Sequence, residues 1–162
     1  MLSKLLSSQV IIYHIFLFIF FSLSVNYFVE LEYINFIAYS LFHLTLIYFA
    51  FYFFNFILIF IYFLYGIFFD IFLINYISPH LLTFLIFISL FYFSKRYLLN
   101  LSSIKISIII IFICLLMLLS ENIIAYLFFN FPINIENLTK LMLITIFSFY
   151  PLIIVFDRID NL

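Results

Sequence analysis

The chain has 162 residues, of which 70% are hydrophobic and only 8% are charged, with a formal net charge of −1. With a mean hydropathy of +1.42, it cannot cover itself with polar surface in water, whereas a bilayer requires this composition, so a soluble globular protein is excluded. Six basic residues are also too few for a nucleic-acid partner, because phosphate binding needs clustered Lys and Arg.

Six apolar runs follow one another along the chain. At about 20 residues per helical span, they fill its length and leave no room for a soluble domain beside them. We therefore expect an all-α integral membrane protein, in which residues 1–162 form a single bundle of about six transmembrane helices. The predicted spans are residues 10–29, 34–50, 56–74, 79–97, 106–129 and 141–156, the last of them broken by Pro151.

The second and third spans follow each other without a Pro or Gly between them. Residues 34–74 carry a single charge, Asp70, and as one helix they would reach about 61 Å, twice a hydrocarbon core of about 30 Å. The chain must therefore fold back once, and we predict the turn at residues 50–55. Within the second span, we expect His43 to be an uncharged imidazole bonded to a neighbouring helix rather than part of a proton relay.

The basic residues predict the orientation of the bundle. If the chain has six spans, five of the six basic residues fall on the same side of the membrane. The exception is Lys140, which lies in a predicted loop at residues 130–140. The five on the shared side are Lys4, Lys95, Arg96, Lys105 and Arg158. Because Lys and Arg are enriched in cytoplasmic loops, we predict that both termini are cytoplasmic.

Two carboxylates, Asp70 and Glu121, lie within the predicted spans, both about 21 to 23 Å from the cytoplasmic end of their helix. An ionised acid at a helix centre costs about 2.5 to 3.5 kcal/mol on insertion scales, so such groups turn inward, pair or stay protonated. Gly66, the only glycine, lies four residues before Asp70 and shares its helix face. We favour a bond from Asp70 to a neighbouring helix that Gly66 allows to come close, over a substrate or ion path and over a catalytic acid.

No enzyme, cofactor or metal site is predicted. His80 is near Asp70 in sequence but lies beyond the end of its helix, and no group of His, Asp and Glu has the spacing of metal ligands. The sequence contains no G-x-S-x-G nucleophile elbow. Its only cysteine, Cys114, excludes a disulfide framework and a cysteine metal site within the chain.

One motif resembles a known family. Gly66 and Asp70 stand at G-x-x-x-D spacing, and Pro79 and His80 follow after a short turn. This pattern resembles the rod shape-determining protein MreD family, in which a G-x-x-x-D helix precedes a short turn, then His or Asn, and another apolar helix. The length, the basic loop after the fourth span and a proline in the last helix are also similar, although Pro79 stands where a glycine is common. The structural or interaction candidates are Gly66, Asp70, Pro79, His80, Glu121 and Pro151.

The resemblance implies a non-enzymatic, multi-pass scaffold of the bacterial inner (cytoplasmic) membrane. It would belong to the cell-elongation machinery, bind the membrane protein MreC, and through it influence the peptidoglycan synthase and the actin-like filament. The helical layout is also similar to that of the substrate-binding subunits of energy-coupling vitamin transporters, which would make the chain a small-molecule binding module. A small intramembrane lipid enzyme is a third reading, disfavoured because no catalytic constellation is present.

Overall fold

The described part of the chain consists almost entirely of helices. The computed structural model describes residues 8–25, 32–54, 56–74, 79–98 and 103–160. These residues form α2 (Ser8–Val25), α3 (Glu32–Tyr52), α4 (Phe56–Phe69), the π-helical segment η1 (Asp70–Ile74), α5 (Pro79–Leu98), α6 (Ser103–Phe129) and α7 (Ile135–Asp160). The prediction of an all-α protein is confirmed.

Four of these helices are long and apolar enough to cross a membrane. They are Tyr33–Tyr52, Phe56–Leu73, Lys105–Phe129 and Ile135–Asp160, while Val10–Val25 and Pro79–Ser94 are shorter apolar helices. At 1.5 Å per residue, a helix of about 20 residues matches a hydrocarbon core of about 30 Å. The chain is therefore a multi-pass membrane protein by length and composition.

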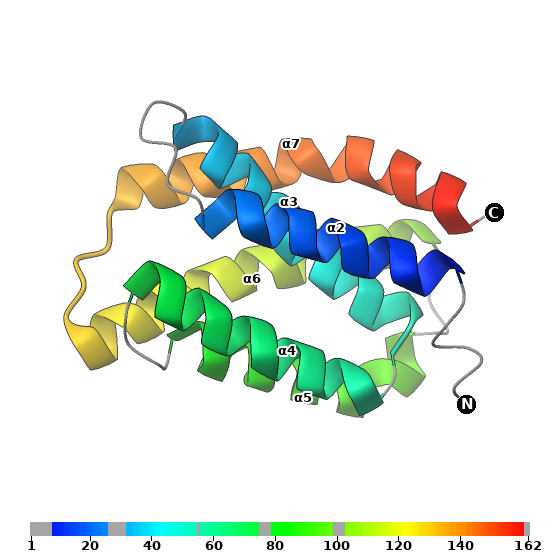
Figure 1. Ribbon diagram of the computed structural model, residues 1–162, viewed down its shortest axis with the longest axis horizontal. Helices are drawn as coiled ribbons and strands as arrows, with labels where there is room; N and C mark the ends of the chain where they lie inside the picture. Colours follow the sequence, from blue (N-terminus) through cyan, green and yellow to red (C-terminus); the bar gives the residue numbers. More distant parts are fainter. Residues whose placement is uncertain (1–7, 26–31, 55, 75–78, 99–102, 161–162) are drawn as a thin grey trace.

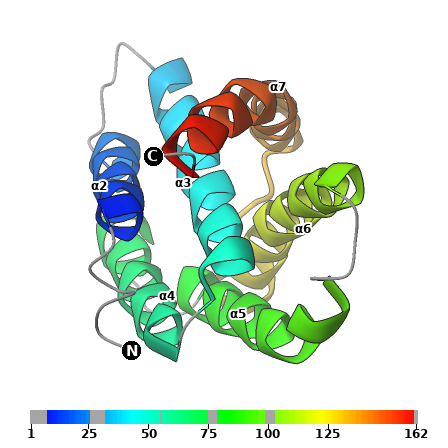
Figure 2. The same ribbon diagram turned by 90° about the vertical axis from the view of Figure 1, so that its right-hand side faces the viewer.

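Helix α3 lies at the centre of the bundle. It contacts α2, α5, α6 and α7, and Figure 2 shows it surrounded by the other helices. In its apolar stretch 67% of the residues are buried inside the protein, against 22 to 28% in the other three long helices. Because protein rather than lipid surrounds α3, it tolerates buried polar residues such as Ser40, His43 and Thr45.

Consecutive helices run in opposite directions along the bundle (Figure 1). One end therefore gathers the starts of α3, α5 and α7 with the ends of α2, α4 and α6, and the other end gathers the opposite termini. The predicted turn at residues 50–55 is confirmed, since α3 ends at Tyr52 and α4 begins at Phe56. Helix α3 ends and α4 begins there although the sequence between them contains no Pro or Gly.

The last two helices differ from the prediction in extent. The loop predicted at residues 130–140 is wrong, because α7 already begins at Ile135. Two asparagines shorten it: Asn130 adopts φ 54° and its N–H bonds the Tyr126 carbonyl at 3.0 Å, which ends α6. The Asn134 side chain accepts the N–H of Asn137 at 3.1 Å, which caps the start of α7.

Pro151 does not break the last helix, contrary to the prediction. Helix α7 continues through it to Asp160. A proline inside a helix removes one backbone hydrogen bond, but helices in a membrane accept this where local adjustment satisfies the freed carbonyl. Pro151 is exposed on the outer side of α7, so the core packing does not depend on its ring.

Candidate functional site

Gly66 on α4 lies directly against the backbone of α5. A Cβ atom built on Gly66 would lie 2.7 Å from the Cα atom of Leu81 and 3.2 Å from its backbone nitrogen. Real Cβ atoms do not come this close to backbone, so only glycine fits without a shift of one helix. The sole glycine of the chain therefore marks a backbone-to-backbone contact, as in small-residue helix interfaces of membrane proteins.

Asp70 caps the start of α5 from the preceding helix. Its Oδ1 accepts the backbone N–H of His80 at 2.9 Å, and its Oδ2 accepts that of Leu81 at 3.1 Å. The first N–H groups of a helix have no partner within the helix. Pro79, at the first position of α5, has no backbone N–H and so needs no acceptor. A buried carboxylate here also lies at the positive end of the helix dipole. The G-x-x-x-D…P-H pattern thus closes a helical hairpin.

The imidazole of His80 extends this contact into the bundle. Its Nδ1 lies 2.8 Å from Asp70 Oδ1, and its Nε2 lies 2.9 Å from the hydroxyl oxygen of Tyr39 on α3. Because an ionised carboxylate only accepts, Nδ1 carries the proton that His80 shares with Asp70. His80 is 5% exposed and Asp70 is fully buried, so this hydrogen-bonded pair is closed off inside the protein.

Tyr39 and His43 connect the hairpin to Glu121 on α6. The Tyr39 hydroxyl donates to Glu121 Oε2 at 2.6 Å, and His43 Nε2 lies 2.9 Å from Glu121 Oε1. The other nitrogen of His43, Nδ1, donates to the backbone carbonyl of Tyr39 at 2.8 Å. His43 is fully buried and Glu121 is 4% exposed. We call Tyr39, His43, Asp70, His80 and Glu121 together the buried polar cluster.

The buried polar cluster is fully satisfied. Within the described residues, no buried side-chain nitrogen or oxygen lacks a hydrogen-bond partner. Aromatic rings pack around the cluster. Phe69 stacks on the His80 ring at 5.5 Å between centroids, and Phe84 packs edge-on against the His43 ring at 5.5 Å. Unpaired polar groups at this depth would cost several kcal/mol each. The arrangement stabilises the contacts of α3, α5 and α6 with one another.

A second polar contact joins α7 to α2 and α3 at the opposite end of the bundle. Asp160, at the end of α7, accepts hydroxyl bonds from Tyr13 on α2 at 2.7 Å and from Tyr48 on α3 at 2.6 Å. Asp160 lies beyond the last predicted span, residues 141–156, and its partners were not predicted. Between the two ends, Thr145 on α7 donates to Ser40 on α3 at 3.0 Å.

The structure brings together four of the six candidate residues in one hairpin and joins a fifth to it. Gly66, Asp70, Pro79 and His80 form the hairpin contact, and Glu121 reaches it through Tyr39. Pro151 takes no part in either polar contact. As predicted, His80 lies beyond the end of the helix that carries Asp70. Its ring and its backbone N–H nevertheless both reach the carboxylate, a contact that the sequence did not predict.

Tyr39 was missed by sequence reasoning, as was the meeting of the two carboxylates. The only sequence feature that indicated this meeting was the predicted position of Asp70 and Glu121 at the same depth in the membrane. The described residues contain no group of three or more His, Cys, Asp and Glu side chains that could hold a metal ion. The chemistry that the buried polar cluster offers is hydrogen bonding and proton exchange.

No protein-family model, curated protein or solved structure matches the chain. Its function must therefore be argued from the motif and the geometry.

Proposed function

We propose that this chain is a non-enzymatic scaffold of the bacterial inner membrane that acts by holding a partner membrane protein, as the resemblance to the MreD family implies. In this proposal all six helices span the bilayer and both termini are cytoplasmic. The partner is an MreC-like membrane protein, through which the scaffold would support peptidoglycan synthesis along the cell wall.

The observation that carries the proposal is the closure of the motif on itself. Gly66 packs on the backbone of Leu81, and Asp70 bonds the first N–H groups of α5 and the ring of His80. Residues that bind a substrate or catalyse a reaction need polar atoms directed toward the substrate. The polar atoms of Asp70 and His80 are directed toward each other and toward the start of α5 instead. They shape a helical hairpin, which is what a contact protein requires from a motif.

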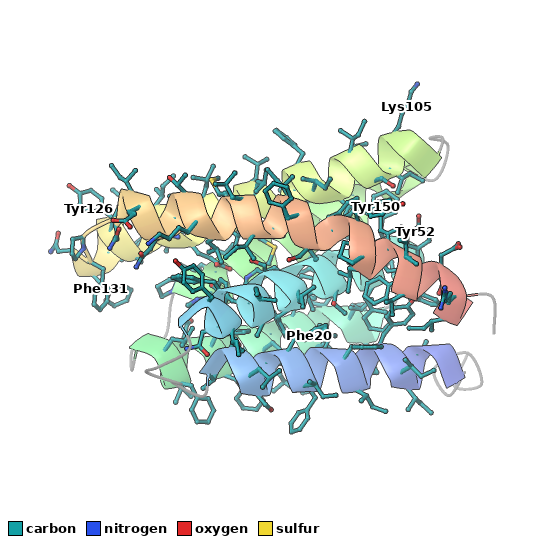
Figure 3. All side chains as sticks on the ribbon, turned by 90° about the horizontal axis from the view of Figure 1, so that it is seen from above. Phe20, Tyr52, Lys105, Tyr126, Phe131 and Tyr150 are labelled. Atoms are coloured by element: carbon teal, nitrogen blue, oxygen red, sulfur yellow. The ribbon has the colours of Figure 1, made fainter. Side chains whose placement is uncertain are left out.

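Basic residues support the proposed orientation. Lys105 at the start of α6 and Arg158 at the end of α7 lie at one end of the bundle, and Lys140 near the start of α7 lies at the other. In Figure 3 Lys105 lies at the end opposite Tyr126 and Phe131. The end with Lys105 and Arg158 is the cytoplasmic one in this proposal.

The topology has a direct test. In a Cys114→Ala background, single cysteines at Ser102 and Ile133 should react with a membrane-impermeant thiol reagent from opposite sides. We expect Ile133→Cys to be labelled in intact cells and Ser102→Cys only after the cytoplasm is opened. Labelling of both positions in intact cells would contradict the six-span arrangement.

The outer rim offers the partner an exposed apolar surface. Between α6 and α7, Phe131 is 42% exposed and Ile135 is 75% exposed, and Figure 3 shows Phe131 projecting from this end. An arginine there would still meet headgroups and water, so it would disturb a partner more than the bundle.

We expect Phe131→Arg and Ile135→Arg to lower recovery of an MreC-like partner at least tenfold when the chain is purified in mild detergent. Expression and thermal stability of the chain should stay unchanged, and rod-shaped cells that depend on it should become round. The matched control is Phe56→Arg, at the opposite rim, because Phe56 is as exposed as Ile135 (76% against 75%). Equal losses at both rims would contradict the proposed contact.

The same purification distinguishes the scaffold from the transporter reading. A scaffold should carry its partner and no stoichiometric small molecule. If the chain emerged alone while retaining one vitamin-like molecule per protein, the small-molecule binding function would replace our proposal.

A further inference from the structure

The buried polar cluster forms an unbroken series of hydrogen bonds that joins α3, α5, α6 and η1. Five bonds join its members: Asp70 to His80, His80 to Tyr39, Tyr39 to Glu121, Glu121 to His43, and His43 to the Tyr39 carbonyl. Their lengths lie between 2.6 and 2.9 Å, the range of strong and charge-assisted bonds. Each of these bonds needs one proton between its two atoms.

A count of protons shows what this chain of bonds requires. With both carboxylates ionised and both imidazoles neutral, the five side chains hold three protons, one each on Tyr39, His43 and His80, and carry a net charge of −2. Five bonds need five protons, so two more must be bound. The completed cluster has a net charge of zero, which is the charge that a buried, membrane-embedded site favours.

The positions of the two additional protons are limited by the geometry. Asp70 accepts from two backbone N–H groups and from His80 Nδ1, so it remains a carboxylate. His43 Nδ1 must donate, because its partner is a carbonyl. The two protons are therefore shared among His80 Nε2, Glu121 and His43 Nε2. Glu121 can hold only one of them, so at least one imidazole is charged.

We propose that the buried polar cluster is a proton-binding site that takes up two protons when the bundle folds and thereby couples the contacts of α3, α5 and α6 to pH. Loss of one proton leaves two acceptor atoms facing each other at less than 3 Å and a net negative charge inside the protein. Addition of a third proton gives the cluster a net positive charge inside the protein. The inference goes beyond the scaffold function and does not depend on it.

Among the described residues, titratable groups on α4 and α6 lie near the cluster. On α4, the fully buried Tyr62 packs against Phe84 and donates its hydroxyl proton to the Leu46 carbonyl at 3.0 Å. On α6, the thiol of Cys114 lies near Tyr39 and Glu121 and is fully buried. From α7 the facing residue is Thr145, bonded to Ser40, and from α2 it is Phe21, which packs edge-on against Phe69 at 4.8 Å. Neither of these titrates. The carboxylate of Asp160 lies at the opposite end of the bundle, bonded to Tyr13 and Tyr48.

The sign of the pH dependence follows from the count. Near pH 8 the unfolded chain has ionised carboxylates and neutral imidazoles, so it holds two protons fewer than the folded cluster. Stability must then fall as pH rises, and the unfolding equilibrium constant should increase up to a hundredfold per pH unit. Below about pH 6 the unfolded imidazoles are also charged, and the dependence should level off.

Glu121→Gln is the decisive variant because it removes one titrating proton and keeps all five bonds. The amide would donate to a neutral His43 and accept from Tyr39, while charged His80 stays paired with Asp70. Folding then takes up one proton, so the unfolding constant in non-ionic detergent should change only tenfold per pH unit between pH 7 and 8. Equal slopes in the variant and the unaltered chain would overturn the proposal.

Glu136→Gln is the matched control. It removes an exposed carboxylate, paired with Lys140 at 2.6 Å on the surface of α7, and should leave the steep slope of the unaltered chain in place. A change of slope in this control equal to that of Glu121→Gln would also overturn the proposal, because the effect would then be general to carboxylates.

A second measurement needs no variant and decides the matter if Glu121→Gln fails to fold. In the full chain labelled with ¹⁵N-histidine, NMR at pH 8 should show at least one of His43 and His80 as an imidazolium. His14, on α2 with its ring edge-on to Phe49, should be neutral and serves as an internal reference. Neutral rings at both buried histidines would contradict the proton count.

Discussion

Replacing Asp70 with leucine should destabilise the bundle by about 3 to 5 kcal/mol, the usual result of removing one partner of a buried charge pair. The change leaves the backbone N–H groups of His80 and Leu81 without an acceptor in a dry interior, and it removes the partner of the His80 ring. The free energy of unfolding in detergent measures the loss. Amide hydrogen exchange at His80 and Leu81 should accelerate with it, because the start of α5 frays.

Asp70→Asn is the graded control for this prediction. Asparagine keeps the shape but has one acceptor oxygen, so its NH₂ group must face a backbone N–H or the His80 ring. We expect an intermediate loss of about 1 to 3 kcal/mol. If the asparagine variant were as stable as the unaltered chain, the carboxylate would not be capping α5 through both oxygens.

Gly66→Ala should also destabilise the bundle, by about 1 to 3 kcal/mol, as overpacking does in a tight core. This sign is informative, because alanine at an open helical position would instead stabilise by up to about 1 kcal/mol. The added Cβ would lie 2.7 Å from the Leu81 Cα atom, so α4 and α5 must separate. Thermal unfolding in detergent measures the effect, and Gly66→Leu should exceed it.

Leu81→Ala separates a backbone contact from a side-chain contact. It removes the Leu81 Cδ1 atom, which would lie 3.4 Å from a Cβ atom at position 66, but leaves the Leu81 Cα atom in place. It should therefore fail to rescue Gly66→Ala. Full rescue would mean that the leucine side chain, rather than the helix backbone, limits the space at Gly66.

The importance of Gly66 and Asp70 was visible in the sequence, while the partners of Asp70 were not. A lone glycine one helical turn before a carboxylate already predicted a close helix contact. The sequence does not show that the start of α5 packs against η1, where the N–H groups of His80 and Leu81 bond that carboxylate. Proximity of this kind depends on how two helices pack.

The sequence by itself determined the helical membrane class, the number of apolar segments and the break between Tyr52 and Phe56. These follow from local quantities, because the length of an apolar run must match the thickness of a bilayer and a longer run must fold back. Helix ends were less predictable, as the start of α7 shows, because capping by an asparagine such as Asn134 depends on local backbone geometry.

Only the tertiary structure decided that Tyr39, His43, Asp70, His80 and Glu121 meet. Tyr39 and Glu121 are separated by 82 positions and His80 and Tyr39 by 41, so no spacing rule along a helix relates them. Which faces of α3, α5 and α6 turn toward one another is set by the packing of the whole bundle. A hydrogen-bond chain that spans three helices exists only once that packing is complete, because four of its five bonds join side chains from different helical segments, which the unfolded chain keeps apart.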